Sequence, residues 1–142
     1  MEGIVQNTFQ PPEVIQSVHE WLKDLFDIRE IDCHFDNLPL TSTCVSHSPI
    51  PSVPLVKSYK SGGDICKYDF SVYMRVLKSD TAKRYDAIAT LHSVADAFKA
   101  GERIEGIRHY TQPTITGNPS QIGSDDDGSD VYQATYQVTY RW

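Results

Sequence analysis

Cysteine is scarce in this chain, and its few positions limit the protein classes that fit. Only three of the 142 residues are cysteines, Cys33, Cys44 and Cys66, and no two of them form a Cys-x-x-Cys pair. An odd number of cysteines without such a pair indicates free thiols in a reducing compartment rather than a disulfide framework.

Long apolar runs are also missing. No uninterrupted stretch of about 18 apolar residues occurs, so we expect no transmembrane helix and no membrane partner. The opening residues MEGIVQNTFQPPEV lack the basic and apolar regions of a secretory signal, so none is expected. Hydrophobic residues make up 39% and charged residues 23% of the chain, which excludes a fully disordered chain, collagen and a coiled coil.

Positive charge is in short supply. The chain has 13 basic and 19 acidic residues, for a net charge of −6. Residues 1–36 hold eight acids and two bases, residues 37–123 hold seven acids and ten bases, and residues 124–142 hold four acids and one base. Only the middle is mildly basic, which argues against tight binding of nucleic acid.

Two stretches have the spacing of amphipathic helices. Apolar residues recur at helical intervals over residues 12–27, directly after Pro11. A second helix is predicted over residues 80–100, with Ser79 or Asp80 as its N-cap and Gly101 just beyond its end. Its predicted inner stripe consists of Tyr85, Ile88, Leu91, His92, Ala95 and Phe98.

Strands are predicted where apolar and polar residues alternate. The clearest cover residues 65–77 and 131–142, and shorter or weaker ones cover residues 31–35 and 103–116. We therefore expect an α+β fold: a mainly antiparallel sheet of about four to five strands, covered on one face by two helices. The length suits a single domain over residues 1–142.

Two further segments depart from this regularity. Residues 38–64 hold Pro39, Pro49, Pro51 and Pro54, and we expect them to form a long Pro-rich arm inserted in the domain, with any strand there at an edge. Leu55 to Lys60 could begin a hairpin that turns at Gly62-Gly63. Residues 117–130 are predicted to form a flexible acidic loop.

No catalytic or metal-binding motif emerges. Cys44 and His47 are three residues apart, but a nucleophile pair needs a rigid scaffold and a flexible arm offers none. His92 is predicted to be a buried, hydrogen-bonded side chain. A calcium loop starting at Asp125 would need a glutamate where Tyr136 stands. We expect no catalytic residue, cofactor or metal, a profile that favours an assembly protein over an enzyme.

The order of elements resembles a known family. The helix VIQSVHEWLKDLF leads into a strand and the Pro-rich segment, followed by KYDFSVYMRVL, the helix TAKRYDAIATLHSVADAF, an acidic glycine-containing loop and the strand VYQATYQVTY. Over nearly the whole chain this resembles the tail-terminator or minor capsid proteins of long-tailed bacteriophages. The shared features are packing patterns, so no catalytic residue is carried over.

The resemblance implies a structural protein of the virion tail or neck, assembled in the host cytoplasm. The resemblance implies that its subunits form a hexameric ring that caps the tail tube and joins it to the head-side connector or head-completion protein. DNA would pass through this ring without specific binding. A head-completion or tail-tube role is the nearest alternative. A small hydrolase using Cys44 or His92, and a single-strand nucleic-acid binder that stacks bases on aromatic strand faces, are the others.

Two sets of residues are candidates for this function. The apolar and proline residues of the arm are predicted to leave the domain body and contact a neighbouring subunit or neck partner: Pro49, Ile50, Pro51, Val53 and Leu55. The acids of the loop are predicted to face the channel and repel DNA: Asp125, Asp126, Asp127 and Asp130. The acids of residues 13–36 are the alternative for the channel lining.

Overall fold

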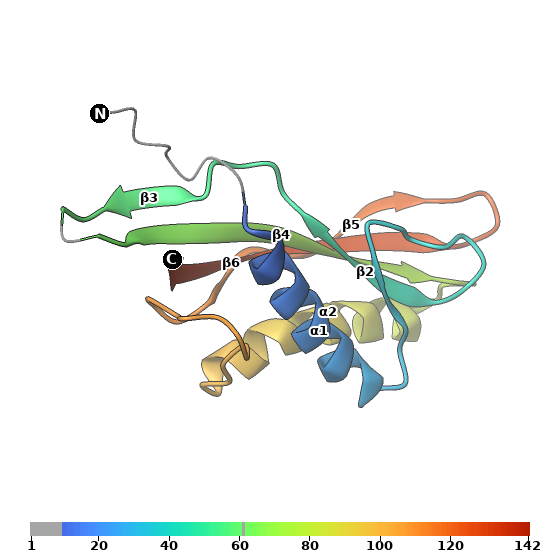
Figure 1. Ribbon diagram of the computed structural model, residues 1–142. Coiled ribbons are helices and arrows are strands. Elements are labelled where there is room, and N and C mark those ends of the chain that lie inside the picture. Colours follow the sequence, from blue (N-terminus) through green and yellow to red (C-terminus); the bar gives the residue numbers. More distant parts are fainter. Residues whose placement is uncertain (1–9, 61) are drawn as a thin grey trace.

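The computed structural model describes residues 10–60 and 62–142 and places two helices against one face of a six-stranded sheet (Figure 1). The helices are α1 (Pro12–Asp27) and α2 (Thr81–Lys99). The strands are β1 (Cys33–Phe35), β2 (Cys44–Pro49), β3 (Leu55–Ser58), β4 (Asp64–Val76), β5 (Thr114–Ser124) and β6 (Asp130–Arg141). This is the α+β fold class expected from the sequence.

The sheet has more strands than expected and is mixed. Its order is β1-β2-β4-β6-β5, and β3 pairs with the part of β4 that β2 leaves uncovered. Neighbouring strands are antiparallel except β1 and β2, which are parallel. The unexpected strand, β2, and the hairpin strand, β3, both come from the segment expected to be an arm.

The centre of the sheet is the long antiparallel pair β4–β6. Its register runs from Ile65 opposite Arg141 to Val76 opposite Asp130. Because side chains alternate along a strand, one face of the pair is apolar and buried under the helices. The buried residues of that face are Cys66, Tyr68, Phe70, Val72, Met74, Val76, Tyr132, Ala134, Tyr136, Val138 and Tyr140. The burial of Phe70 and Tyr136 confirms the predicted sheet face.

The helices begin and end close to where the sequence predicted, but α2 is rotated relative to the predicted stripe. Tyr85 is 70% exposed and Ile88 is 39% exposed, and His92 is exposed as well. The buried residues of α2 are Ala87, Thr90, Leu91, Ser93, Val94, Ala97 and Phe98. Small side chains let the helix approach the sheet closely, so they replace the bulkier predicted residues at the interface. Neither helix is long and apolar enough to cross a membrane, within the part of the chain that is described.

The prediction of an arm over residues 38–64 is wrong. Residues 44–49 form β2, which lies inside the sheet between β1 and β4 and is mostly buried. The prolines flank this strand rather than interrupt it, since Pro49 is its last residue and the others lie outside it. Leu55–Ser58 pairs with β4 through a turn containing two glycines with positive φ, which confirms the predicted hairpin.

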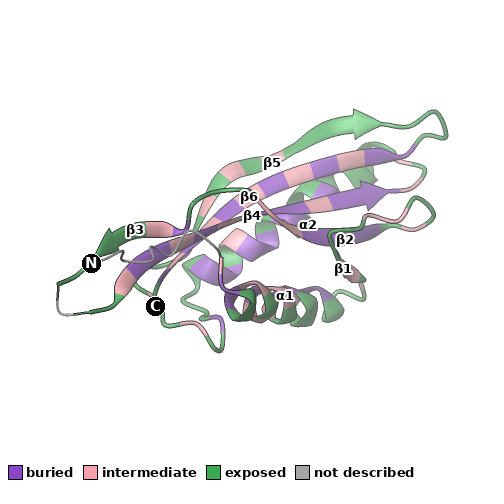
Figure 2. Ribbon diagram, turned by 45° about the horizontal axis from the view of Figure 1, so that its top comes forward, coloured by how far each residue is buried: buried purple, intermediate pink, exposed green. Residues whose placement is uncertain are grey.

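The predictions on either side of residue 116 also need correction. Residues 103–113 hold no strand beyond one isolated bridge at His109, and β5 begins at Thr114. Gly117 to Ser124 belong to β5 rather than to a loop, and only residues 125–129 form the turn before β6. The polar composition is tolerated because β5 is an edge strand, largely exposed along its length (Figure 2).

Candidate functional site

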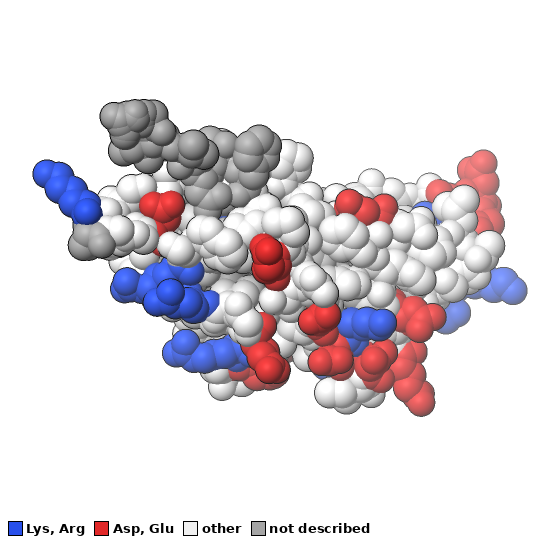
Figure 3. Space-filling model, viewed as in Figure 1, with Lys and Arg blue, Asp and Glu red and all other residues white. Residues whose placement is uncertain are grey.

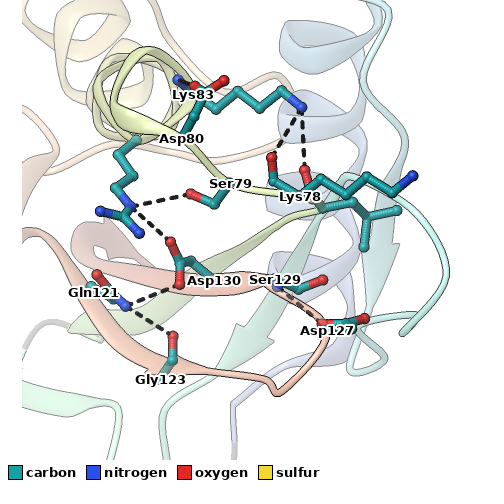
Figure 4. Close-up of polar contacts among 11 residues, drawn as sticks. Lys78, Ser79, Asp80, Lys83, Gln121, Gly123, Asp127, Ser129 and Asp130 are labelled. Carbon is teal, nitrogen blue, oxygen red and sulfur yellow. Dashed lines mark hydrogen bonds and ion pairs between the residues drawn. The ribbon is translucent and has the colours of Figure 1, made fainter.

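Three of the four acids predicted to face a channel lie in the turn between β5 and β6, and the fourth, Asp130, is the first residue of β6. Two of the four, Asp125 and Asp130, are held in ion pairs. Asp130 is 3% exposed, and its carboxylate accepts hydrogen bonds from Arg84 Nε at 3.0 Å and Gln121 Nε2 at 3.2 Å (Figure 4). Arg84 Nε also lies 3.3 Å from Ser79 Oγ. Asp130 thus ties β6 to the start of α2 and cannot project into solvent, which corrects its prediction as a loop charge.

The other three acids differ from one another. Asp125 pairs with Arg75, a side chain of β4 that is 8% exposed. Asp127 accepts a hydrogen bond from the Ser129 backbone at 3.0 Å, and that bond lowers the pKa of Asp127. Asp126 is exposed and has no hydrogen bond or ion pair with a described residue. The turn is therefore anchored rather than free, and only Asp126 and Asp127 present unpaired charge.

The residues predicted as a subunit interface lie along the sheet instead of leaving it. Pro49 is opposite Phe70 in the sheet, and the Ile50 backbone donates to the carbonyl of Asp69 at 2.9 Å. Leu55 packs partly against the core, whereas Pro51 is exposed and Val53 is 58% exposed. Of this set, Pro51 and Val53 offer the most surface to a partner, and contact with a neighbouring subunit stays a prediction.

A buried histidine cluster lies between β2, β4 and α1. His47 is fully buried, and its Nε2 lies 2.7 Å from the hydroxyl of Tyr68. Its Nδ1 lies 3.4 Å from Nδ1 of His19, and the two rings stack. Burial, and to a lesser extent the nearby His19, lowers the pKa of His47 to about 3. His47 is therefore neutral at physiological pH and acts as a polar member of the core.

The two side chains considered for nucleophilic catalysis do not meet. Cys44 lies opposite Arg75 and His47 lies opposite Val72, so these side chains leave β2 on opposite faces of the sheet. His92 is on the surface of α2, where Nδ1 lies 3.1 Å from the carboxylate of Asp96 one turn away. The prediction that His92 is buried is wrong, for the same reason that the stripe of α2 was misplaced.

The sheet face that the helices leave uncovered carries a network of polar contacts. Gln133 Nε2 donates to the hydroxyls of Ser71 and Tyr73, both at 3.1 Å. Asp69 accepts a hydrogen bond from Gln137 at 2.8 Å and pairs with Lys67 at 3.4 Å. The contacts of Gln133 and Gln137 cross from β6 to β4 and help to hold the two strands together, which leaves a hydrogen-bonding surface on this face.

A groove runs between α1 and the segment 102–106, and we call it the α1 groove. It has a volume of about 680 Å³. Its floor contains Trp21, which stacks on Phe98 with ring centroids 4.9 Å apart. Gly106 fixes one wall, because a Cβ there would lie 2.8 Å from Ser17 Oγ and its φ is +87°. The acids that line the groove are Glu20, Asp24, Glu102 and Glu105.

Sequence reasoning missed both the histidine cluster and the α1 groove. Val45 and His47 alternate with polar neighbours, a pattern that indicates a strand. The prolines around them favoured the interpretation of the segment as an arm instead. The groove is formed by segments some 80 residues apart in the chain. A pattern within one short segment of sequence cannot predict a groove that two distant segments form together.

Comparison with known proteins yields the fold alone. No family model matches the chain, and no curated protein matches it. Fifteen chains of solved structures match it. One of them, which carries no descriptive name, superposes with a TM-score of 0.54 over 92% of this chain and 94% of its own length, at 12% sequence identity. The arrangement of helices and strands therefore recurs in another protein.

Proposed function

We propose that this chain is a virion structural protein of a long-tailed bacteriophage: a tail terminator whose subunits form a ring, with six as the expected number. In this role the ring caps the tail tube and meets the head-side connector or head-completion protein. This function requires surfaces that bind other proteins and requires no catalytic side chain.

The pairing of β4 with β6 is the observation that carries this proposal. The two strand sequences that carry the resemblance, KYDFSVYMRVL and VYQATYQVTY, fall on β4 and β6, which pair with each other along twelve residue pairs. They form the centre of the sheet, and the predicted helices cover one of its faces. The sequence resemblance therefore falls on the framework of the fold rather than on scattered surface positions.

The surface gives two further reasons for an assembly role. The uncovered sheet face presents hydroxyl and amide groups in fixed positions, which suits contact with another protein surface. Apolar side chains also gather in the α1 groove, where the 84%-exposed Ile28 lines the surface together with Trp21 and Leu25 among acidic residues. Contiguous apolar surface rimmed by polar groups is typical of interaction surfaces.

If DNA passes through the ring, acidic side chains of the turn between β5 and β6 would repel its phosphates and keep it from binding to the channel. Duplex DNA carries one negative charge per roughly 1.7 Å, so a basic channel lining would hold it through many contacts. Asp126 and Asp127 are the two acids of the turn free to face a channel.

The direct functional test uses tail tubes that lack their terminator. The purified chain is added to such tubes, which are then imaged by electron microscopy. A tail terminator binds one end of each tube, stops further growth and allows heads to join. Binding along the whole tube would favour a tail-tube role, and binding to heads alone would favour head completion. Absence of binding to either component would contradict the proposal.

A further inference from the structure

One end of the sheet is basic and projects from the body of the molecule. The β3–β4 hairpin reaches past α1 in Figure 1. Lys57 and Lys60 are exposed on it, and Lys57 lies opposite Ile65, which in turn pairs with Arg141. The Arg141 backbone donates to the carbonyl of Arg108 at 2.8 Å. We call this group the hairpin end.

Apolar surface accompanies this positive charge. Val56 is 57% exposed and Tyr59 is 37% exposed on the hairpin, and Trp142 beside it is 52% exposed. Lys57 Nζ lies 5.0 Å from the centre of the Tyr59 ring, a cation–π contact that keeps charge and aromatic surface together. The hairpin end is therefore both basic and partly apolar.

The α1 groove has the opposite character. Four acids line it against one base, Arg103, and its apolar residues include Leu25 and the 84%-exposed Ile28. The acids continue along the helix and beyond: residues 13–36 hold seven acids and two bases. Figure 3 shows a group of basic side chains at the β3–β4 end and many acidic ones toward α1, with further basic side chains at the opposite end of the molecule. The hairpin end and the α1 groove therefore differ in the sign of their charge.

The open edge of the sheet offers a poorer contact. β5 has register irregularities at three places along its pairing with β6, and Pro119 lies within it. Bulges and prolines on an edge strand obstruct pairing with another strand. A contact between copies through side chains is therefore favoured over extension of the sheet through β5.

We infer that the hairpin end of one copy docks in the α1 groove of the next copy, with Lys57 and Lys60 facing Glu20 and Asp24 around an apolar centre. This inference rests on the proposed function and specifies the surfaces through which the ring assembles. The evidence for a second copy as occupant is that this chain itself carries the basic, partly apolar element that complements the groove. Contact between two different patches repeats around an axis, so it builds a closed ring when the rotation closes.

Charge reversal on each surface separately provides the test. The hairpin variant is Lys57→Glu with Lys60→Glu, and the groove variant is Glu20→Lys with Asp24→Lys. All four residues are exposed, so folding should survive, as circular dichroism will show. Each variant alone juxtaposes like charges at every contact. A one-to-one mixture again brings opposite charges together at every contact, provided that the two variants alternate.

We expect the subunit contact in each variant to weaken at least tenfold relative to the unmodified chain, measured by light scattering across a concentration series. The equimolar mixture should recover assembly. Two matched controls carry the same charge changes elsewhere on the surface: Lys78→Glu with Lys99→Glu, and Asp86→Lys with Asp96→Lys. Both controls should assemble like the unmodified chain.

Three results would overturn the inference, and they separate it from the proposed function. If either charge variant assembles normally, or if the mixture does not recover, the ring uses other surfaces while the tail-terminator role stands. If assembly is normal but the groove variant no longer binds a tube or connector protein, that protein occupies the groove. If the unmodified chain stays monomeric and does not bind tube ends, both the inference and the proposed function fail.

Discussion

The hydroxyl of Tyr68 and Nε2 of His47 lie 2.7 Å apart and share a hydrogen bond inside the core. Tyr68 is 1% exposed and His47 is fully buried, so each satisfies a polar group of the other that water cannot reach. The pair joins β2 to β4, and His19 adds a contact from α1. A segment rich in proline is thereby fixed to the body of the sheet.

This pair makes stability depend on pH. Burial keeps His47 neutral in the folded protein, with a pKa lowered from 6.5 to about 3. The unfolded chain takes up a proton below the ordinary histidine pKa while the folded chain does not. The contribution of His47 is therefore complete above the unfolded pKa and is lost as pH falls toward 3, at up to about 1.4 kcal/mol per pH unit.

Chemical denaturation at a series of pH values measures this effect. His47→Gln should make the acid-side decline in stability shallower, because the amide does not titrate. His92→Gln makes the same substitution at an exposed position and serves as the control for the exchange of imidazole for amide. An unchanged slope in His47→Gln would mean that His47 is charged or solvated in the folded chain.

Removing the buried carboxylate at the start of β6 should destabilise the fold. Asp130→Asn exchanges a carboxylate held by Arg84 and Gln121 for a neutral amide, and we expect a loss of about 1–2 kcal/mol in the free energy of unfolding. Asp126→Asn, at an exposed position in the preceding turn, should change the free energy of unfolding by less than about 0.5 kcal/mol. Equal effects in the two variants, measured by urea denaturation, would show that the turn is not anchored through Asp130.

The sheet core and the outer face of α2 should respond very differently to truncation. Phe70 is fully buried, with its ring 5.3 Å from that of Tyr68, and Phe70→Ala should cost about 3–5 kcal/mol. Tyr85→Ala removes a side chain that is 70% exposed and should cost less than about 0.5 kcal/mol. Thermal unfolding compares the two. A large loss in Tyr85→Ala would restore the originally predicted stripe.

The acidic turn can be tested for an effect on DNA passage without breaking its anchors. Asp126→Lys combined with Asp127→Asn lowers negative charge while leaving Asp125 with Arg75 and Asp130 with Arg84. We expect particles to assemble normally and to release DNA more slowly. The asparagine oxygen can still accept from the Ser129 backbone. Release at the original rate from intact particles would remove the turn from the channel lining.

The sequence anticipated those parts of the fold whose signals are local. The alternation of KYDFSVYMRV and VYQATYQVTYR predicted β4 and β6 nearly to the residue, and Pro11 with Pro12 marked the start of α1. Apolar spacing sufficed there, because each pattern is long and one face is buried. The same logic failed for α2, where alanine, serine and threonine occupy the buried face and leave Tyr85 outside.

The candidate surfaces were harder to predict because they depend on contacts distant in the chain. Whether Asp130 is a free charge depends on Arg84, which lies 46 residues away. The prolines at 51 and 54 do not form part of an arm, because the strands before and after them, β2 and β3, both pair with β4. The composition of such a segment shows only that it is polar or rich in proline. Whether it joins the sheet depends on strands that are distant in the sequence.

Native mass spectrometry of the purified chain tests the central claim most directly. The tail-terminator account predicts one dominant closed species with the mass of six subunits, which weakens as ionic strength rises because salt screens contacts between charged surfaces. A chain that remains monomeric over the whole concentration range, or that forms an open-ended series of sizes, would contradict the account.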